Sequence, residues 1–402
     1  MKNNIFHTQD LCFAQTCDAL ESSAEMEIYM KVVIAIDSFK GSMTSMEAGN
    51  AAKKGILAAK PDAEVCLSPL ADGGEGTVDA LIEGLGAKKI PVTVTGPLGE
   101  KVSCYYGFLE ETKSAVMEMA SAAGITLVTK KDPLRASTYG VGEMIADALK
   151  RGCKNFMIGI GGSATNDGGI GMLKALGFEF FDEDGNDVGE GAAALAKIEV
   201  IRTENKNPLL SGTKFQIACD VKNPLCGKQG ATYIFGPQKG VTEEQKEQVD
   251  EAMRHYADVT KESLDCDFAD CEGAGAAGGL GYAFLSYLAG ELIPGVELIL
   301  QATGLEEKMK NADVVVTGEG RLDAQTVMGK APAGVAALAK KYNAKVIAFA
   351  GSVAPEAKVC NRAGIDAFFP IVRGVTTLEE AMKKEDAMEN IAATAEQVFR
   401  LL

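Results

Sequence analysis

KVVIAIDSFKGS, residues 31–42, opens with a short run of apolar, mostly β-branched residues and closes with residues typical of a turn. The first half of this segment predicts a buried parallel strand. A helix is expected over residues 42–59, because Thr44 or Ser45 can cap its first turn and because alanine and lysine fill its interior. A second strand is expected over residues 63–68. The chain therefore begins with the strand–helix–strand rhythm of an α/β protein.

The same rhythm returns near the C-terminus, after a long middle segment with a different pattern. The middle begins with closely spaced strands, the first two joined through Gly-Pro-Leu-Gly, so we expect a β-rich or mixed segment there. Two early and three late parallel strands predict one doubly wound sheet that a second α/β domain interrupts. In the order 2-1-3-4-5, the first and third strands are neighbours, and their carboxyl ends form a ligand-binding crevice. The late strands are expected at 312–317, 345–350 and 367–372, and the middle ones at 89–94, 101–108 and 114–119.

The expected domain boundaries follow from this change of rhythm. Residues 30–88 and 291–402 are predicted to form the interrupted sheet domain, and residues 89–290 the inserted domain. Residues 1–29 contain several acidic residues and no long apolar core, so they do not have the pattern of a signal peptide. We interpret them as an N-terminal extension, since the first convincing strand begins directly after Met30.

The composition describes a globular protein with an ample core, since 47% of the 402 residues are hydrophobic and 24% are charged. A net charge of −16 argues against a broad nucleic-acid-binding surface, but a locally positive anion site remains compatible with it. No apolar run approaches the roughly 20 residues that a membrane span needs. Ten cysteines without a CxxC pair and two histidines do not have zinc-site spacing. We therefore expect reduced cysteines and a cytoplasmic protein.

Three segments at predicted strand ends combine a carboxylate with glycine: DSFKGS at 37–42, ADGGEG at 71–76 and GEGRLD at 318–323. Phosphoryl transfer needs this mixture. Carboxylate oxygens hold Mg²⁺, cationic side chains neutralise the phosphoryl group, and glycine lets backbone N–H groups reach phosphate oxygens. Each segment alone is also typical of an ordinary turn. Three of them at one predicted crevice favour a site for phosphoryl transfer.

A further loop, GGSATNDGG at residues 161–169, follows an apolar strand and precedes a predicted helix at 170–176. Its glycine and polar residues suit a phosphate or carboxylate cradle at a helix N-terminus. Asp167 is expected either to cap this helix or to bind a metal. Asp220 ends another predicted strand, and FGPQKG at 235–240 follows it, but there a structural turn and a binding site remain equal alternatives.

Other enzyme classes have weaker support. The glycine pattern at 273–278 matches the dinucleotide-binding fingerprint but follows an acidic stretch rather than a strand. A similar pattern at 159–164 lies in a polar loop that would crowd a pyrophosphate. Gly329-Lys330 is followed by alanine instead of Ser or Thr, so it is no Walker A motif. Two histidines give little basis for a Ser-His-Asp hydrolase.

In this order and number, the motifs resemble the bacterial glycerate kinase family, and the resemblance covers nearly all of residues 31–402. It departs from the family at Ile36, where proline is common, and at residues 1–29, which have no counterpart. The stretches that carry it are VVIAIDSFKGSMTS, PLADGGEGT, GPLGEKV, IGIGGSATNDGG, ACDVKNPLCG, GATYIFGPQKG, GAGAAGGLG and VVTGEGRLDAQT with GKAPAGVA.

The resemblance implies phosphorylation of D-glycerate by ATP with Mg²⁺, with 2-phosphoglycerate as the favoured product, and a flavodoxin-like domain that carries an inserted α/β domain. The alternatives are a kinase for another small hydroxy acid and a two-domain protein that only binds a carboxylate. The oligomeric state stays open, with a homodimer as one candidate.

The predicted catalytic residues are Asp37, Lys40, Asp72, Glu319 and Arg321, and the predicted Mg²⁺ ligands are Asp37, Asp72 and Glu319. The other predicted ligand- or phosphate-binding residues are Ser38, Gly73, Gly74, Glu75, Gly161, Gly162, Ser163, Thr165, Asn166, Asp167, Asp220, Gly318, Asp323 and Lys330.

Overall fold

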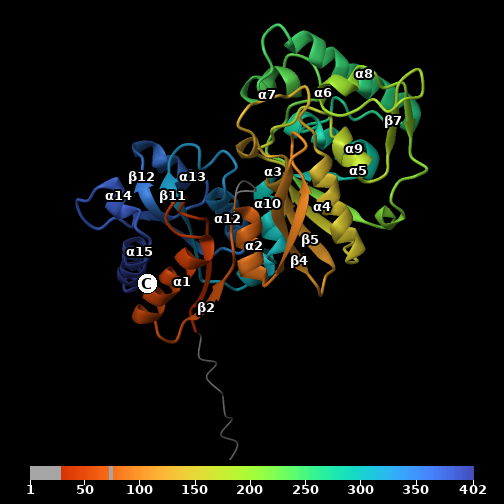
Figure 1. The fold of residues 1–402 in the computed structure, drawn as a ribbon. Helices are drawn as coiled ribbons and strands as arrows, with labels where there is room; N and C mark the ends of the chain where they lie inside the picture. Colours follow the sequence, from red (N-terminus) through yellow and green to blue (C-terminus); the bar gives the residue numbers. More distant parts are fainter. Residues whose placement is uncertain (1–28, 72–75) are drawn as a thin grey trace, which may run out of the picture.

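The computed structural model describes residues 29–71 and 76–402, which form two lobes (Figure 1). The two ends of the described chain build one lobe, and the middle of the chain builds the other. The predicted extension at residues 1–29, apart from Tyr29, lies outside the described residues. So do four predicted site residues, which are Asp72, Gly73, Gly74 and Glu75.

The first lobe contains a five-stranded sheet in the order β13-β12-β11-β1-β2, in which every neighbouring pair is parallel. This confirms the predicted doubly wound sheet and its strand order. Ile36 pairs with Gly318, so the carboxyl ends of β1 and β11 lie side by side. The strands are β1 (Lys31–Ile36), β2 (Glu64–Leu67), β11 (Val314–Leu322), β12 (Lys345–Val353) and β13 (Ala367–Pro370).

Helices cover both faces of this sheet. Thr44 caps α1 as expected: its hydroxyl accepts from the Glu47 N–H at 3.2 Å, and the Glu47 carboxylate accepts from the Thr44 N–H at 2.9 Å. Gly55 lets α1 approach α15, since a Cβ there would lie 1.9 Å from the Ala392 carbonyl oxygen. The helices are α1 (Ser45–Ala59), α2 (Thr77–Leu85), α10 (Gly295–Ala302), α11 (Leu305–Met309), α12 (Ala331–Lys340), α13 (Val359–Arg362), α14 (Leu378–Ala381) and α15 (Lys384–Phe399).

The second lobe contains a six-stranded mixed sheet in the order β10-β9-β6-β5-β4-β3. Its first two strands form an antiparallel pair, within the β-rich or mixed segment that the sequence predicted. The strands are β3 (Lys88–Thr95), β4 (Lys101–Leu109), β5 (Ser114–Glu118), β6 (Asn155–Gly159), β9 (Lys214–Ala218) and β10 (Glu291–Ile293), with β7 (Glu179–Phe181) and β8 (Val200–Arg202) paired separately. The helices are α3 (Ala120–Ala123), α4 (Tyr139–Lys150), α5 (Ile170–Ala175), α6 (Ala192–Leu195), α7 (Ala231–Lys239), α8 (Lys246–Leu264) and α9 (Leu280–Leu288).

Three elements differ from the expectation. β11 continues to Leu322 because its backbone stays paired with β12 as far as Val353, so the predicted turn segment 318–323 is largely strand. The expected closing helix at 378–402 is broken between α14 and α15, where Lys383 leaves the helical conformation. The six-stranded sheet includes β10, which lies just beyond position 290. The domain boundaries themselves stay a prediction.

Apolar packing and several polar contacts join the two lobes. Val116 of β5 belongs to the same buried cluster as Val78 of α2 and Val296 of α10. The N–H of Val78 donates to the Glu118 carboxylate at 3.1 Å, at the end of β5. The carboxyl edge of the first sheet therefore faces a neighbouring lobe rather than open solvent alone.

No helix in the described ranges is long and apolar enough to cross a membrane. The described cysteines are all free thiols. Cys66 and Cys219 are half-buried.

Candidate active site

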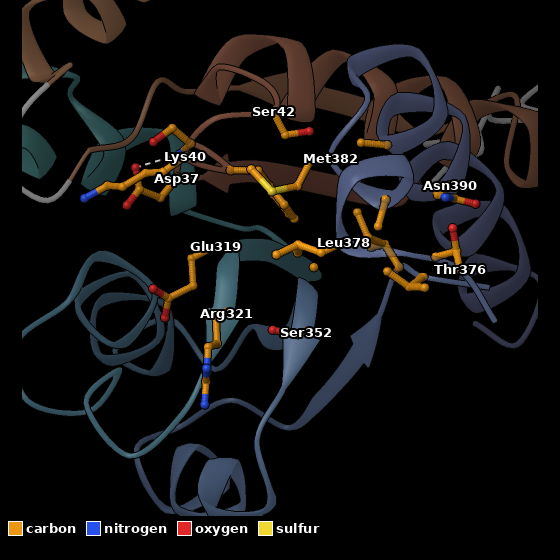
Figure 2. A pocket seen from close by; sticks show the side chains of 18 of the residues that line it. Asp37, Lys40, Ser42, Glu319, Arg321, Ser352, Thr376, Leu378, Met382 and Asn390 are labelled. Carbon is orange, nitrogen blue, oxygen red and sulfur yellow. Dashed lines mark hydrogen bonds between the residues drawn. The ribbon is translucent and has the colours of Figure 1, made fainter. Parts of the chain in front are cut away.

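A cavity of about 620 Å³ lies at the carboxyl edge of the five-stranded sheet, and we call it the first cavity. Its charged residues follow β1 or lie in or after β11. Its remaining wall comes from β12 and from residues 371–390 (Figure 2). This is the predicted switch-point crevice, where open α/β sheets bind their ligands. Of the predicted site residues, the first cavity brings together Asp37, Ser38, Lys40, Glu319, Arg321, Asp323 and Lys330.

Asp37 extends β1 by one more hydrogen bond toward β11. Its N–H donates to the Gly318 carbonyl at 2.9 Å, and its Oδ1 accepts from the Ser38 N–H at 2.7 Å. The residue is buried and lines the first cavity. Gly318 itself does not line the cavity, but its pairing fixes the position of Asp37 relative to Glu319. Two carboxylates therefore leave neighbouring strands at the same edge of the sheet.

Glu319 is only 7% exposed, although it carries a carboxylate. Its Oε1 accepts a hydrogen bond of 2.6 Å from the Thr326 hydroxyl, and its Oε2 lies 3.5 Å from the Lys330 ammonium. Burial raises the pKa of Glu319, while Thr326 and Lys330 act in the opposite direction. Glu319 is thus a carboxylate with increased proton affinity, as a general base needs.

Cationic side chains surround these carboxylates. Lys330 forms the N-cap of α12, and its Nζ also lies 3.9 Å from the Asp323 carboxylate. The Nε of Arg321 is 3.6 Å from Asp323, and the Arg321 side chain is largely exposed. Lys40 is exposed at the same edge. The first cavity therefore combines negative and positive groups, as a site for a metal-bound polyphosphate requires.

A second cavity of about 340 Å³ lies in the inserted lobe. Of the predicted binding residues, Gly161, Gly162, Ser163 and Asp220 line it. Oδ1 of Asp220 accepts from the Gly295 N–H at 2.8 Å, at the start of α10. Among the described residues, none lines both cavities.

The sequence profile of the glycerate kinase family matches residues 32–402. The chain belongs to the glycerate kinase family. It is therefore a kinase. Two relatives match it over nearly the whole of their own length. Glycerate kinase of Bacillus subtilis (strain 168) is 45% identical over 371 residues, which cover 92% of this chain and 97% of the relative. Glycerate 2-kinase of Escherichia coli (strain K12) is 45% identical over 372 residues, which cover 91% and 98%.

A crystal structure supports the fold of this family member. A protein of Salmonella typhimurium LT2 assigned as glycerate kinase 2 superposes with a TM-score of 0.86 at 43% identity, and the match covers 93% of this chain and 98% of that one. The two-lobed arrangement of the kinase is therefore shared with a solved relative.

Three predicted residues of the kinase lie behind the second cavity rather than at its surface. Thr165, Asn166 and Asp167 are fully buried and do not line it. The Asp167 carboxylate accepts from the Gly169 and Gly171 N–H groups at 3.1 and 3.3 Å. Burial raises its pKa, and Thr138 donates to it with both its N–H and its hydroxyl, each at 2.8 Å. The N-cap of α5 is Gly169, and the Asp167 carboxylate accepts from N–H groups at the start of this helix without being its N-cap residue.

Sequence reasoning missed Lys239, which lines the second cavity and is 1% exposed. Its Nζ donates to the Thr165 carbonyl at 2.7 Å. Burial lowers the pKa of Lys239 to about 7, although the nearby Asp167 charge raises it. The signal was present in FGPQKG at 235–240, but the burial of its lysine depends on how α7 packs and not on the local sequence.

The donor groups of the first cavity fit Mg²⁺. No three His, Cys, Asp or Glu side chains of the described residues gather closely enough to hold a metal ion by themselves. Mg²⁺ does not require such a cluster, because it takes one or two carboxylates together with waters and substrate phosphate oxygens. Asp37 and Glu319 offer hard oxygen atoms on neighbouring strands. Asp72, the third predicted ligand, lies outside the described residues.

Proposed function

We propose that this kinase transfers the γ-phosphoryl group of ATP directly to the C2 hydroxyl of D-glycerate, with Mg²⁺, and forms 2-phosphoglycerate. The observation that carries the proposal is the pair of buried carboxylates Asp37 and Glu319 on neighbouring strands, beside Lys330, in a cavity large enough for a nucleotide. The relatives named glycerate kinase and glycerate 2-kinase support the substrate and the position of the product phosphate.

The chemistry is an in-line displacement. The glycerate oxygen bonds to the γ-phosphorus, the bond to the β–γ bridging oxygen breaks, and ADP leaves with that electron pair. Glu319 accepts the hydroxyl proton, because its raised pKa makes it a stronger base than an exposed glutamate. Lys330, Arg321 and Lys40 offset the negative charge of the phosphates. The Ser38 N–H holds the Asp37 carboxylate, and the Asp323 carboxylate lies beside Arg321 and Lys330.

Of the three predicted ligands, Asp37 and Asp72 would hold Mg²⁺, which when bound would neutralise charge on the transferred phosphates, and Glu319 is kept for the proton. Burial raises the pKa of Glu319, so Glu319 is the stronger candidate base, and Asp37 at the end of the neighbouring strand is the candidate ligand in the same cavity.

The second cavity supplies the anion site of the inserted lobe. Gly161, Gly162 and Ser163 offer backbone and hydroxyl groups, and Lys239 adds a buried cation beside them. A carboxylate bound there would be stabilised by the charge of Lys239 in a site of low dielectric constant. We therefore assign the substrate carboxylate to the second cavity. Since the two cavities have separate linings, the lobes must approach each other for transfer.

The test is product analysis by ³¹P NMR after incubation with ATP, Mg²⁺ and D-glycerate. A phosphate on the C2 oxygen couples to one proton and gives a doublet, whereas a phosphate on the C3 oxygen couples to two protons and gives a triplet. A doublet supports the proposal, and a triplet overturns the assigned position. Turnover with another hydroxy acid but not with glycerate would support the alternative substrate.

A further inference from the structure

The first cavity is larger and less polar than a three-carbon hydroxy acid requires. Its volume of about 620 Å³ falls in the range of drug- and cofactor-sized pockets. Part of its wall is polar, but another part consists of Phe39, Ile371, Leu378 and Met382. A ligand that fills this cavity therefore contacts charged groups at one end and apolar side chains farther along.

The charged side chains lie at one end of the cavity, and apolar side chains lie between them and the uncharged polar residues at the other end. In Figure 2, Asp37 and Lys40 lie at one end, Asn390 and Thr376 lie at the other, and the side chains of Leu378 and Met382 lie between them. Leu378 is 77% exposed and Met382 is 37% exposed. Exposed large apolar side chains at a cavity wall indicate a surface that a ligand covers.

We propose that the apolar part of the first cavity binds the adenine base of the nucleotide, with Leu378 and Met382 against the ring and Asn390 at its edge. The phosphates then extend toward Asp37, Lys40 and Glu319. This inference rests on the proposed function, which names ATP as the phosphoryl donor, and it adds the position and recognition of the base.

Asn390 provides the chemistry for selecting adenine. Its amide offers both a donor and an acceptor, and no hydrogen bond within the described residues engages it. Adenine presents a ring-nitrogen acceptor next to an amino donor, which an amide can bind with two hydrogen bonds. Guanine presents an oxygen in place of the amino group, so the same amide matches it poorly. The aliphatic side chains contact the flat ring without base preference.

A tryptophan reporter tests where the base binds. The chain contains no tryptophan, so Leu378→Trp places its single tryptophan at the apolar wall, where excitation at about 295 nm avoids the tyrosines. We expect ADP to change its emission saturably in the absence of glycerate, whereas inorganic tripolyphosphate should leave it nearly unchanged. The matched control is Leu401→Trp, because Leu401 is 85% exposed and lies outside the cavity. An equal response to ADP and tripolyphosphate would overturn the proposal.

The selectivity of Asn390 variants for ATP over GTP provides the second measurement. Asn390→Asp removes the donor, so the ratio of kcat/KM for ATP to that for GTP should fall about tenfold or more. Asn390→Ala should lower it less, because no charge then attracts the guanine N–H groups. An unchanged ratio in both variants would contradict base recognition by Asn390.

The two proposals fail in different ways. If the Leu378→Trp variant gives the saturable response to ADP but the wild type does not phosphorylate glycerate, the base site stands and the proposed substrate is wrong. If the wild type phosphorylates glycerate from ATP while the reporter and the selectivity stay unchanged, the proposed function stands and the base site is wrong.

Discussion

Glu319 and Lys330 face each other at the carboxyl edge of the first sheet, with Oε2 and Nζ 3.5 Å apart. Lys330 is held at the N-cap of α12, and Glu319 is held within β11, so the backbone fixes both ends of this contact. Burial raises the pKa of the carboxylate, while Lys330 keeps its anionic form accessible. Glu319 can therefore accept a proton, and Lys330 can offset phosphate charge, at the same point of the cavity.

Removing either buried carboxylate should stop turnover without unfolding the protein. We expect Asp37→Asn and Glu319→Gln each to lower kcat by about 10²–10⁴-fold, because the amides keep size but lose the charge that binds metal or accepts a proton. The measurement is kcat at saturating ATP, glycerate and Mg²⁺, together with thermal unfolding.

Asp366→Asn is the matched control, since Asp366 lies on the same lobe at the opposite end of the sheet, where it bonds to Lys340. Its kcat should stay near that of the wild type. Near-normal turnover in both cavity variants, with unfolding temperatures unchanged, would move the chemistry to Asp72 or to the second cavity.

The pH profile of the kinase should report the Glu319–Lys330 contact. Protonated Glu319 cannot accept the substrate proton, so kcat should fall as the pH decreases through its pKa. Lys330→Met removes a cation that lowers this pKa, so the acidic limb should move to higher pH. A lower kcat with an unmoved acidic limb would show that another group titrates there.

The sequence alone predicted the sheet that positions the site, because strand order follows from short apolar runs and from the handedness of their connections. Asp37 and Glu319 could be found because carboxylates at the ends of neighbouring parallel strands meet at one edge. The apolar wall of the first cavity could not be predicted from the sequence. The periodicity over residues 378–402 predicts one helix, and the break at Lys383 that brings Leu378 over the cavity depends on tertiary packing.

In the inserted lobe, the orientation of the loop at residues 161–169 could not be predicted from the sequence either. A loop rich in Gly, Ser, Thr, Asn and Asp has the same composition whether it binds a ligand or stabilises a helix start. Gly161 and Ser163 line the cavity, but Asp167 is directed into the protein, where Thr138 donates to it. Local sequence does not determine which side of such a loop faces solvent.

Lys239 should make stability depend on pH in a defined direction. Burial lowers its pKa from 10.5 to about 7, so between these values the folded state binds fewer protons than the unfolded state. The stability of the wild type relative to Lys239→Met should therefore rise as the pH increases from 7 toward 10.5. Asp167, the acidic group whose charge acts on Lys239, stays unchanged in this comparison.

Urea unfolding over a pH series from about 6 to about 10 measures this difference. Lys222→Met is the control, because the side chain of Lys222 is 80% exposed, and its difference from the wild type should not vary with pH. A flat difference for Lys239→Met as well would mean that the buried amine keeps its ordinary proton affinity.

Domain closure should require both substrates. The candidate ligands of the first cavity lie on the five-stranded lobe, and Gly161, Ser163 and Lys239 lie on the inserted lobe. A nucleotide and a carboxylate that bind to separate lobes can react only if the lobes approach, so small-angle scattering should show a smaller radius of gyration with ADP and glycerate together than with either alone. Lys239→Met should abolish the additional compaction while ADP binding persists. Equal radii in all states of the wild type, with both ligands bound, would instead place both substrates on one lobe.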